Sequence, residues 1–431
     1  VEVLDDPSLA GKPVIVGGSG ARGVVAACTY EARMYGVHSA IPSSVAKRLC
    51  PTAIFLDGRY HRYTEVSRQL NDIFESVTPL VEGISLDEAF LDVTGARQLL
   101  GDGPAIAWTI RSRVRQELKL ACSVGVGRNK LMAKLASKAA KPVATRSGVA
   151  PGPGVVVVPR HGELDFLHPL PVRALWGVGP VTGRRLESLG VTCIGDIAAL
   201  PAGVLEHALG PAAGAHLDAL ARGHDPRPVV AEQPAKSIGH EETFASDLWD
   251  PAELHRHLTR MVDASATGLR RSGLAARTVS VKLRFADFTM VTRSHSMGSP
   301  IDTTAAIGAV AAALLESVDL HQGVRLLGVS LAGLGDPGSG LQLSLDLGPT
   351  ATGPSGERPA RAGDEAEDIQ QSWGAVTRAV DAIRARYGGA SVGPASLVGP
   401  RGLRVRNRGE AQWGPRARPE PEVGEGRTGT L

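Results

Sequence analysis

The sequence lacks the features of several protein classes. Its four cysteines are far apart and form no Cys-x-x-Cys pair, so neither a disulfide framework nor a zinc site is indicated. No apolar run reaches the roughly 18 residues that suggest a membrane span. The opening residues Val-Glu-Val-Leu-Asp-Asp have neither the basic nor the apolar part of a signal peptide. These absences predict a reduced, cytoplasmic protein with no membrane partner.

Aromatic residues (4%) and net charge (+3) are also low, whereas 43% of the residues are hydrophobic. A chain of 431 residues with this composition is expected to form two to four globular domains. Its basic residues gather in clusters, at 111–115, 128–141, 184–185 and 270–271. Such clusters fit a nucleic-acid path, and they also fit ordinary solvated helix faces.

The adjacent carboxylates Asp87 and Glu88 are the first candidate site. They lie between apolar segments that predict β-strands, around Val81–Ile84 and Phe90–Val93. A solvated turn is one interpretation of the pair. Hard oxygen ligands next to buried strands also suit Mg²⁺, which gives the second interpretation.

The chain up to a Gly/Pro-rich boundary near 148–154 mixes short strands and helices, and we expect one sheet that carries the two carboxylates. Residues 163–222 are predicted to be helical. There, Gly177 and Gly179 precede a helix whose free backbone N–H groups could bind a phosphate. A weaker echo at 209–214 suggests a helix-hairpin-helix grip on DNA, and a simple helical hairpin is the alternative.

Residues 225–235 are predicted to be a linker, and residues 236–335 show the order βαββαβ. We expect one face of this sheet to be cationic, either for phosphate contact or for solubility, with side chains from Lys236, Lys282, Arg284, Arg293 and His295. Residues 348–431 are predicted to be mostly disordered. One helix near 373–387 carries an apolar stripe that could pack on the body or on a partner.

Four motifs together resemble Y-family DNA polymerases, and the bacterial DNA polymerase IV branch in particular. They are Tyr30-Glu-Ala-Arg33, Ser85-Leu-Asp-Glu-Ala-Phe-Leu-Asp92, Ser123-Val-Gly-Val-Gly-Arg-Asn-Lys130 and Ala140-Lys141-Pro142. The resemblance runs from residue 1 to about 347. It implies a multidomain α+β fold shaped as a right hand, and template-directed addition of deoxynucleotides in low-fidelity translesion synthesis.

The resemblance also implies domain limits. The palm would comprise residues 1–18 and 60–148 without its first strand, and the small fingers would comprise 19–59. The helix-hairpin-helix thumb would comprise 149–224, and the little finger would comprise 236–335.

By the same resemblance, Asp87 and Glu88 are catalytic and hold two Mg²⁺ ions, with Asp87 bridging both. Tyr30, Arg33 and Lys141 are expected to hold the deoxynucleoside triphosphate. Primer-template DNA would contact Gly177, Gly179, Lys236 and Ser237.

The sequence departs from the family pattern at two places. Family members carry Asp-x-Asp-x-Phe-Phe shortly before the equivalent of Val1-Glu2, so the third metal-binding carboxylate and the aromatic that excludes ribonucleotides are expected upstream of Val1. Ala27 replaces a hydroxyl residue found in many relatives, at a cost of about 1 kcal/mol. We therefore favour a truncated record of an active polymerase. The alternative is a catalytically impaired, clamp-binding adaptor that keeps the polymerase fold.

The segment 342–347 resembles the peptide by which bacterial polymerases bind the sliding clamp (β subunit). Gln342 would bond in the clamp pocket, and the apolar anchors would be Leu343, Leu345 and Leu347. A last strand of the little finger is the alternative. We expect a monomer that gains processivity from the clamp.

Overall fold

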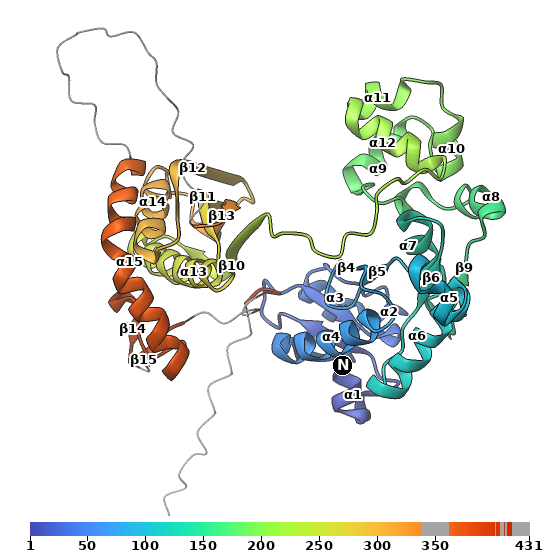
Figure 1. Cartoon of the computed structure of the whole chain (residues 1–431), viewed down its shortest axis with the longest axis horizontal. Coiled ribbons are helices and arrows are strands. Elements are labelled where there is room, and N and C mark those ends of the chain that lie inside the picture. Colours follow the sequence, from blue (N-terminus) through green and yellow to red (C-terminus); the bar gives the residue numbers. More distant parts are fainter. Residues whose placement is uncertain (338–361, 401, 406–408, 410–411, 416–431) are drawn as a thin grey trace, which may run out of the picture.

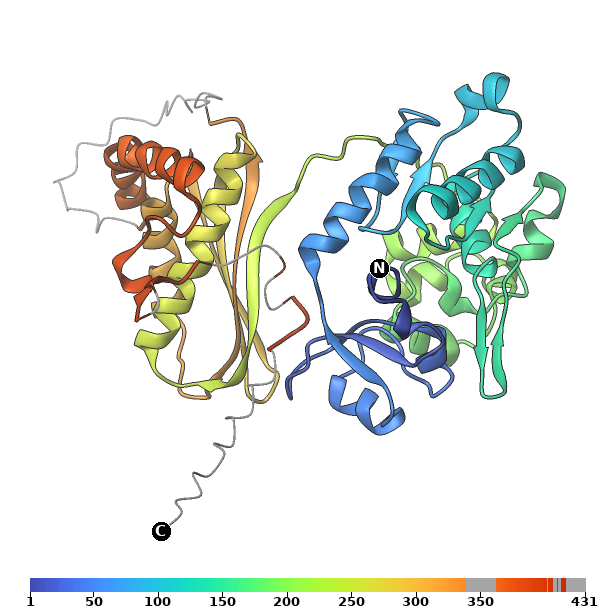
Figure 2. The same cartoon turned by 90° about the horizontal axis from the view of Figure 1, so that it is seen from below.

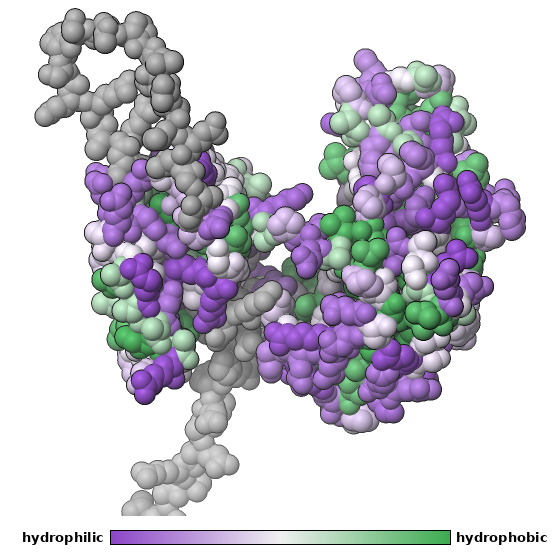
Figure 3. Space-filling view, in the orientation of Figure 1, coloured by the Kyte–Doolittle hydropathy of each residue, from purple (hydrophilic) through white to green (hydrophobic). Residues whose placement is uncertain are grey.

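The structure is a computed structural model, which describes residues 1–337, 362–400, 402–405, 409 and 412–415. Within these residues, the side chains of 362–364 are not described. Figure 1 shows two bodies joined by an extended segment, with the N-terminal half in one and the little finger in the other. In the space-filling view a gap separates the upper parts of the two bodies (Figure 3). No described helix is long and apolar enough to cross a membrane.

The first layer is a three-stranded sheet with the order β2-β1-β3, formed by Val25–Cys28, Val14–Gly17 and Ile54–Asp57. β1 pairs antiparallel with β2 and parallel with β3. The short helices α2 (Tyr30–Arg33) and α3 (Ser43–Leu49) complete this unit. Its small core contains buried apolar side chains from these elements and the connecting loops, namely Ile15, Val25, Ala32, Val37, Ala46 and Cys50.

Two longer helices support the carboxylate segment. α4 (Tyr60–Glu75) and α6 (Gly103–Leu118) pack together around Ile73, Ile106 and Ile110. The segment itself is the hairpin β4 (Val81–Gly83) and β5 (Ala89–Leu91). β6 (Val124–Val126) pairs in parallel with β9 (Val155–Val157), and α7 (Lys130–Ala139) connects to the hairpin β7 (Val143–Thr145) and β8 (Gly148–Ala150).

Two predictions about this half need correction. The single sheet is not present among the described residues: the β4–β5 and β6–β9 pairs form separate two-stranded ladders. Strands of three residues offer few backbone groups for a wider sheet. In addition, β9 lies inside the predicted thumb, 149–224, yet it pairs with β6. Its three consecutive valines favour a strand, so the chain leaves this half only after β9.

The thumb is a compact helical unit, as the apolar spacing predicts. It contains α8 (Glu163–Leu167), α9 (Pro180–Ser188), α10 (Ile194–Ala199), α11 (Val204–Leu209) and α12 (Pro211–Ala221). Leu186, Ile194 and Leu220 are fully buried in its core, which continues into α7 through Leu131 and Met132. The thumb and α7 therefore share one core.

The little finger has the predicted βαββαβ order. Its strands β10 (Ser237–Leu248), β13 (Val324–Gly335), β11 (Ala275–Phe285) and β12 (Met290–Ile301) form an antiparallel sheet in that spatial order. α13 (Pro251–Arg271) and α14 (Thr304–Glu316) cover one face around a large apolar core.

The prediction that all these basic side chains share one face of the sheet is wrong for Arg293 and His295. Lys282 pairs with Thr292, whereas Arg293 pairs with Val281 and His295 with Val279. Paired residues share a face, so Arg293 and His295 lie on the side of the buried valines, opposite Lys282. Residues on a strand alternate between faces, and the register of β12 decides this division.

The chain beyond 361 also differs from the predicted disorder. α15 (Ala362–Tyr387) starts well before the expected helix at 373–387 and packs against α14 and β12. β14 (Val398–Gly399) and β15 (Gly402–Leu403) follow it. Buried ion pairing explains the order, because Arg384 binds Asp263 at 3.0 Å with both side chains largely buried. The predicted clamp peptide 342–347 lies outside the described residues.

Candidate active site

A tight turn presents the carboxylate pair at the end of the β4–β5 hairpin. The amides of Ile84 and Ser85 both donate to the Glu88 carbonyl, at 2.8 and 3.2 Å, and this closes the turn. The Ser85 hydroxyl donates to Asp87 Oδ1 at 2.6 Å and accepts from the Asp87 amide at 3.3 Å. Asp87 is exposed, so its carboxylate is oriented locally and remains open to solvent.

Two lysines face the neighbouring carboxylate. Lys134 Nζ lies 3.2 Å from Glu88 Oε2, and Lys141 Nζ lies 3.8 Å from Glu88 Oε1. All three side chains are partly exposed, so these pairs contribute little to stability. Their effect is to place two positive charges beside the carboxylates. The structure thus places Lys141, which is expected to hold the triphosphate, beside Glu88, and it adds Lys134, which the sequence did not single out.

The other predicted nucleotide-binding side chains come from α2, which directly follows β2. The Arg33 guanidinium lies 5.6 Å from the centre of the Tyr30 ring. α2 contacts the β7–β8 hairpin, which begins two residues after Lys141. α2, which carries Tyr30 and Arg33, therefore lies close to the hairpin that follows Lys141.

Glu82 on β4 is a residue that the sequence did not single out. Its carboxylate accepts from Lys130 Nζ at 2.8 and 2.7 Å, from the Val230 amide at 2.9 Å and from the Gln233 side chain at 3.2 Å. Burial would raise the pKa of Glu82, but the bonds from Lys130 and Val230 outweigh burial and leave that pKa below its ordinary value. Glu82 therefore ties the hairpin to α7 and to the linker.

Trp176 joins the thumb to this hairpin. Its ring lies 6.0 Å from that of Phe90 on β5, and the cations of Lys134 and Arg227 lie 5.2 and 4.8 Å from its centre. Offset aromatic pairs and cation–π contacts of this kind are stabilising. The turn that begins at Gly177 is thus anchored beside the carboxylates.

The predicted DNA-binding glycines form the turn before α9. Gly177 has φ +95°, a conformation that other residues rarely adopt, and Gly179 caps a helix that starts with Pro180. The echo is also present, because Gly210 has φ +89° and precedes α12. Lys236 and Ser237 lie elsewhere, at the start of β10 and exposed. The predicted DNA contacts of the thumb turn and those at the start of β10 are therefore on different elements of different bodies.

The residues at the turn fit a hard divalent cation in part. Asp87 and Glu88 supply two adjacent carboxylates, and Mg²⁺ binds through one or two carboxylates while it keeps waters and takes phosphate oxygens. Within the part of the chain that the structure describes, no group of three or more His, Cys, Asp or Glu side chains could hold a metal.

Comparisons with known proteins identify the family of this chain. The profile of the impB/mucB/samB family matches residues 1–138, its C-terminal domain matches 235–345, and its HHH motif matches 162–191. A DNA polymerase IV of Desulfatibacillum aliphaticivorans is 41% identical over 399 residues, which cover 92% of this chain and 93% of that protein. The chain belongs to the impB/mucB/samB family.

Further similar proteins agree in sequence and fold. A DNA polymerase IV of Halorhodospira halophila is 46% identical, with coverage of 78% of this chain and 91% of that protein. The solved Y-family DNA polymerase chimera Dbh-Dpo4(243-245)-Dbh covers 78% of this chain and 95% of its own, with a TM-score of 0.69 and 26% identity. The insertion ternary complex of Dbh DNA polymerase has a TM-score of 0.54 and 27% identity. The expected Y-family hand with its α+β fold is thereby confirmed.

Proposed function

We propose that this chain is a DNA-directed DNA polymerase of the translesion type, which binds primer-template DNA and deoxynucleoside triphosphates and depends on a divalent metal. Family membership over nearly the whole chain supports this activity. The observation that carries the site assignment is the Asp87–Glu88 turn facing Lys134 and Lys141. A carboxylate pair bordered by cations suits a substrate that arrives as a metal-bound triphosphate.

The finer mechanism is a two-metal phosphoryl transfer that uses Mg²⁺. Asp87 would hold both ions and Glu88 would hold the ion beside the primer 3′-hydroxyl. When bound, the metal supplies a polarised hydroxyl and neutralises the charge of the leaving pyrophosphate.

The protein's own cations would then orient the triphosphate. In this proposal Arg33 binds phosphate oxygens through its planar fork, and Lys141 acts as a point charge that leaves Glu88 for the substrate. The phenol of Tyr30 donates a hydrogen bond to the same phosphates. These contacts position the reacting atoms, which is the main demand of this chemistry.

Primer extension with Mg²⁺ and deoxynucleotides tests the proposal. Asp87→Asn keeps the shape of the side chain and removes the metal-binding charge, so extension should fall by at least about 1,000-fold. DNA binding, measured by fluorescence anisotropy, should stay within about twofold. Asp72→Asn, an exposed carboxylate on α4, is the matched control and should extend normally. Normal extension by Asp87→Asn would refute the site assignment.

A non-catalytic adaptor is the second candidate. It is favoured by one observation, that the described residues offer two clustered carboxylates and no third metal-binding group. An adaptor predicts no primer extension by this chain under the same conditions, with DNA binding intact.

We also propose that Gln342, Leu343, Leu345 and Leu347 bind the sliding clamp and that the chain acts as a monomer. Apolar anchors at alternate positions suit an extended peptide in a shaped pocket. The double variant Leu345→Ala, Leu347→Ala should keep basal extension and lose stimulation by added clamp. Clamp stimulation equal to that of the parent would contradict this assignment.

A further inference from the structure

A short C-terminal segment lies on the fingers, although the two are far apart in the sequence. The Trp413 carbonyl accepts from the Val24 amide at 2.9 Å, and the Pro415 carbonyl accepts from the Gly20 amide at 2.9 Å. Figures 1 and 2 both show this segment between the little finger and the β1–β3 sheet. We call Gly409 together with residues 412–415 the Trp413 clasp.

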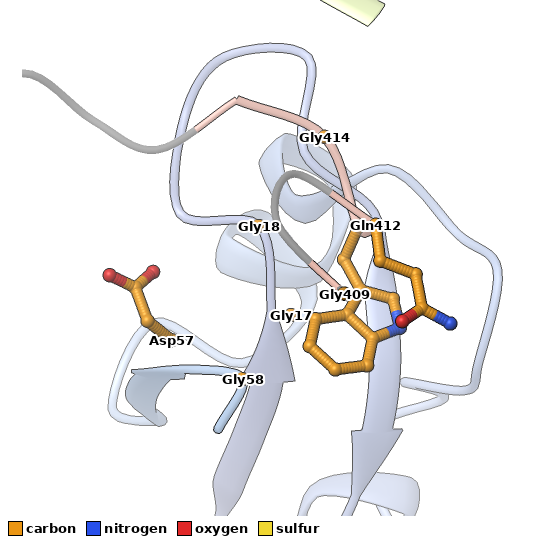
Figure 4. A pocket seen from close by; sticks show the side chains of 8 residues that line it. Gly17, Gly18, Asp57, Gly58, Gly409, Gln412 and Gly414 are labelled. Carbon is orange, nitrogen blue, oxygen red and sulfur yellow. The ribbon is translucent and has the colours of Figure 1, made fainter. Parts of the chain in front are cut away.

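The surface under the Trp413 clasp is made of glycines at the ends of two strands. A Cβ atom on Gly58 would overlap the Trp413 ring, and one on Gly18 would overlap the Trp413 carbonyl. The Tyr63 ring lies 6.2 Å from the indole. In Figure 4, Gly409, Gln412 and Gly414 lie over Gly17 and Gly58, while the Asp57 carboxylate points away from them. The groove thus has room for this backbone and this ring because side chains are missing from its floor.

The Trp413 clasp begins on the other body. α15 is fixed to the little finger by the buried Arg384–Asp263 pair and by the Arg270–Asp381 pair at 2.6 Å. The direct connection between the bodies, residues 224–236, has no regular structure. The chain that leaves α15 and reaches the fingers is therefore a second covalent route across the gap.

A polar contact beside the groove supports the same arrangement. Arg22 donates to Asp247 at 2.8 Å and to the Phe244 carbonyl at 3.2 Å, both on β10. Gly414 lies against the Arg22 carbonyl, where a Cβ would approach to 2.7 Å. One short loop of the fingers thus contacts the little finger directly and the Trp413 clasp as well.

We infer that the Trp413 clasp is an internal ligand of the fingers that holds the little finger against them and slows the entry of DNA. The occupant of the groove is this chain's own C-terminal segment, with Trp413 as its anchor. One aromatic anchor and two backbone hydrogen bonds make a small contact. Attachment to the same chain raises its effective concentration, so the contact persists and still opens reversibly.

Hydrogen exchange tests the clasp without reference to polymerase activity. In Trp413→Ala, exchange of the amides in residues 18–25 should accelerate at least tenfold, because Gly20 and Val24 lose their acceptors. Trp373→Ala is the matched control, since Trp373 is a half-exposed tryptophan on α15. Gly58→Ala, which fills the groove from the opposite side, should give the same acceleration as Trp413→Ala. Unchanged exchange in both groove variants would overturn the inference.

The effect on DNA entry rests on the proposed function and is measured separately. Stopped-flow anisotropy with a fluorescein-labelled primer-template should show association several-fold faster in Trp413→Ala than in the parent or Trp373→Ala. Faster exchange with equal association rates would overturn the control of DNA entry. Absence of DNA binding in the parent and all variants would instead count against the proposed function.

Discussion

Replacing Glu82 by Gln should destabilise the palm more than any change on its surface. The Glu82 and Lys130 side chains are only 10% and 9% exposed, and the carboxylate accepts both lysine bonds. Glutamine keeps the volume but leaves the Lys130 ammonium buried without a counter-charge. Breaking a buried pair in this way costs about 3–5 kcal/mol, against a typical domain stability of about 5–15 kcal/mol.

A double variant separates the charge from the hydrogen bonds. Adding Lys130→Met to Glu82→Gln removes the unpaired ammonium, so part of the loss should be recovered. Recovery should be incomplete, because the Val230 amide and the Gln233 side chain also used the carboxylate. A weakened acceptor for these two donors leaves a residual loss of stability of about 1–3 kcal/mol.

The chain has several domains, so a local measurement is needed. Hydrogen exchange in α7 reports the unit that contains Lys130. A loss of 3 kcal/mol corresponds to an acceleration of about 100-fold. Exchange in α13, in the little finger, is the internal control and should not change. An α7 exchange rate within about twofold of the parent would refute the argument that this pair is buried and necessary.

The pH dependence of the same measurement follows from the depressed pKa of Glu82. A carboxyl whose pKa is lower in the folded state stabilises the fold above its unfolded pKa, which is about 4.3 for glutamate. This stabilisation is lost as the pH falls through the folded-state pKa. The stability of α7 should therefore decline below about pH 4 in the parent, and the decline should be smaller in Glu82→Gln, which has nothing to protonate there.

Two further predictions concern the substrate and the tail. Lys141→Ala should raise the KM for deoxynucleotides about tenfold and leave DNA affinity unchanged. Lys138→Ala, at an exposed position in the last turn of α7 shortly before Lys141, should change neither. Arg384→Met should leave Asp263 buried without its partner, at about 3–5 kcal/mol, and release α15 to limited proteolysis while primer extension persists. Equal KM values in the first case, or a protected α15 in the second, would contradict these arguments.

Local chemistry made much of this fold predictable. The alternating and helical periods from 236 to 335 predict every element of the little finger in order, because each buries one apolar face. Gly177 predicts the thumb turn, because few other residues adopt φ +95°. Asp87 and Glu88 are recognisable since their motif is contiguous.

Features that depend on distant partners were not predictable in the same way. The residues next to Glu82 in the sequence do not indicate that Lys130 and Val230 bind its carboxylate. Lys134 is likewise indistinguishable in the sequence from a solvated lysine, because its contact with Glu88 depends on the packing of α7 beside the turn. The division of Arg293 and Lys282 between two faces depends on the register of β12. Register follows from pairing across strands, which composition does not encode.

α15 shows how the usual rule for amphipathic helices can fail. Its apolar stripe faces solvent, with Trp373 50%, Val376 49%, Ile383 41% and Tyr387 66% exposed. Its buried side is mixed: Ala366 and Ile369 pack on the little-finger core, and Arg384 finds a carboxylate on α13 that offsets the cost of burial. The two uses considered for this helix, contact with the body or with a partner, are therefore not exclusive. The body takes the side of α15 that carries Ala366, Ile369 and Arg384, and the apolar stripe stays available on the outer surface.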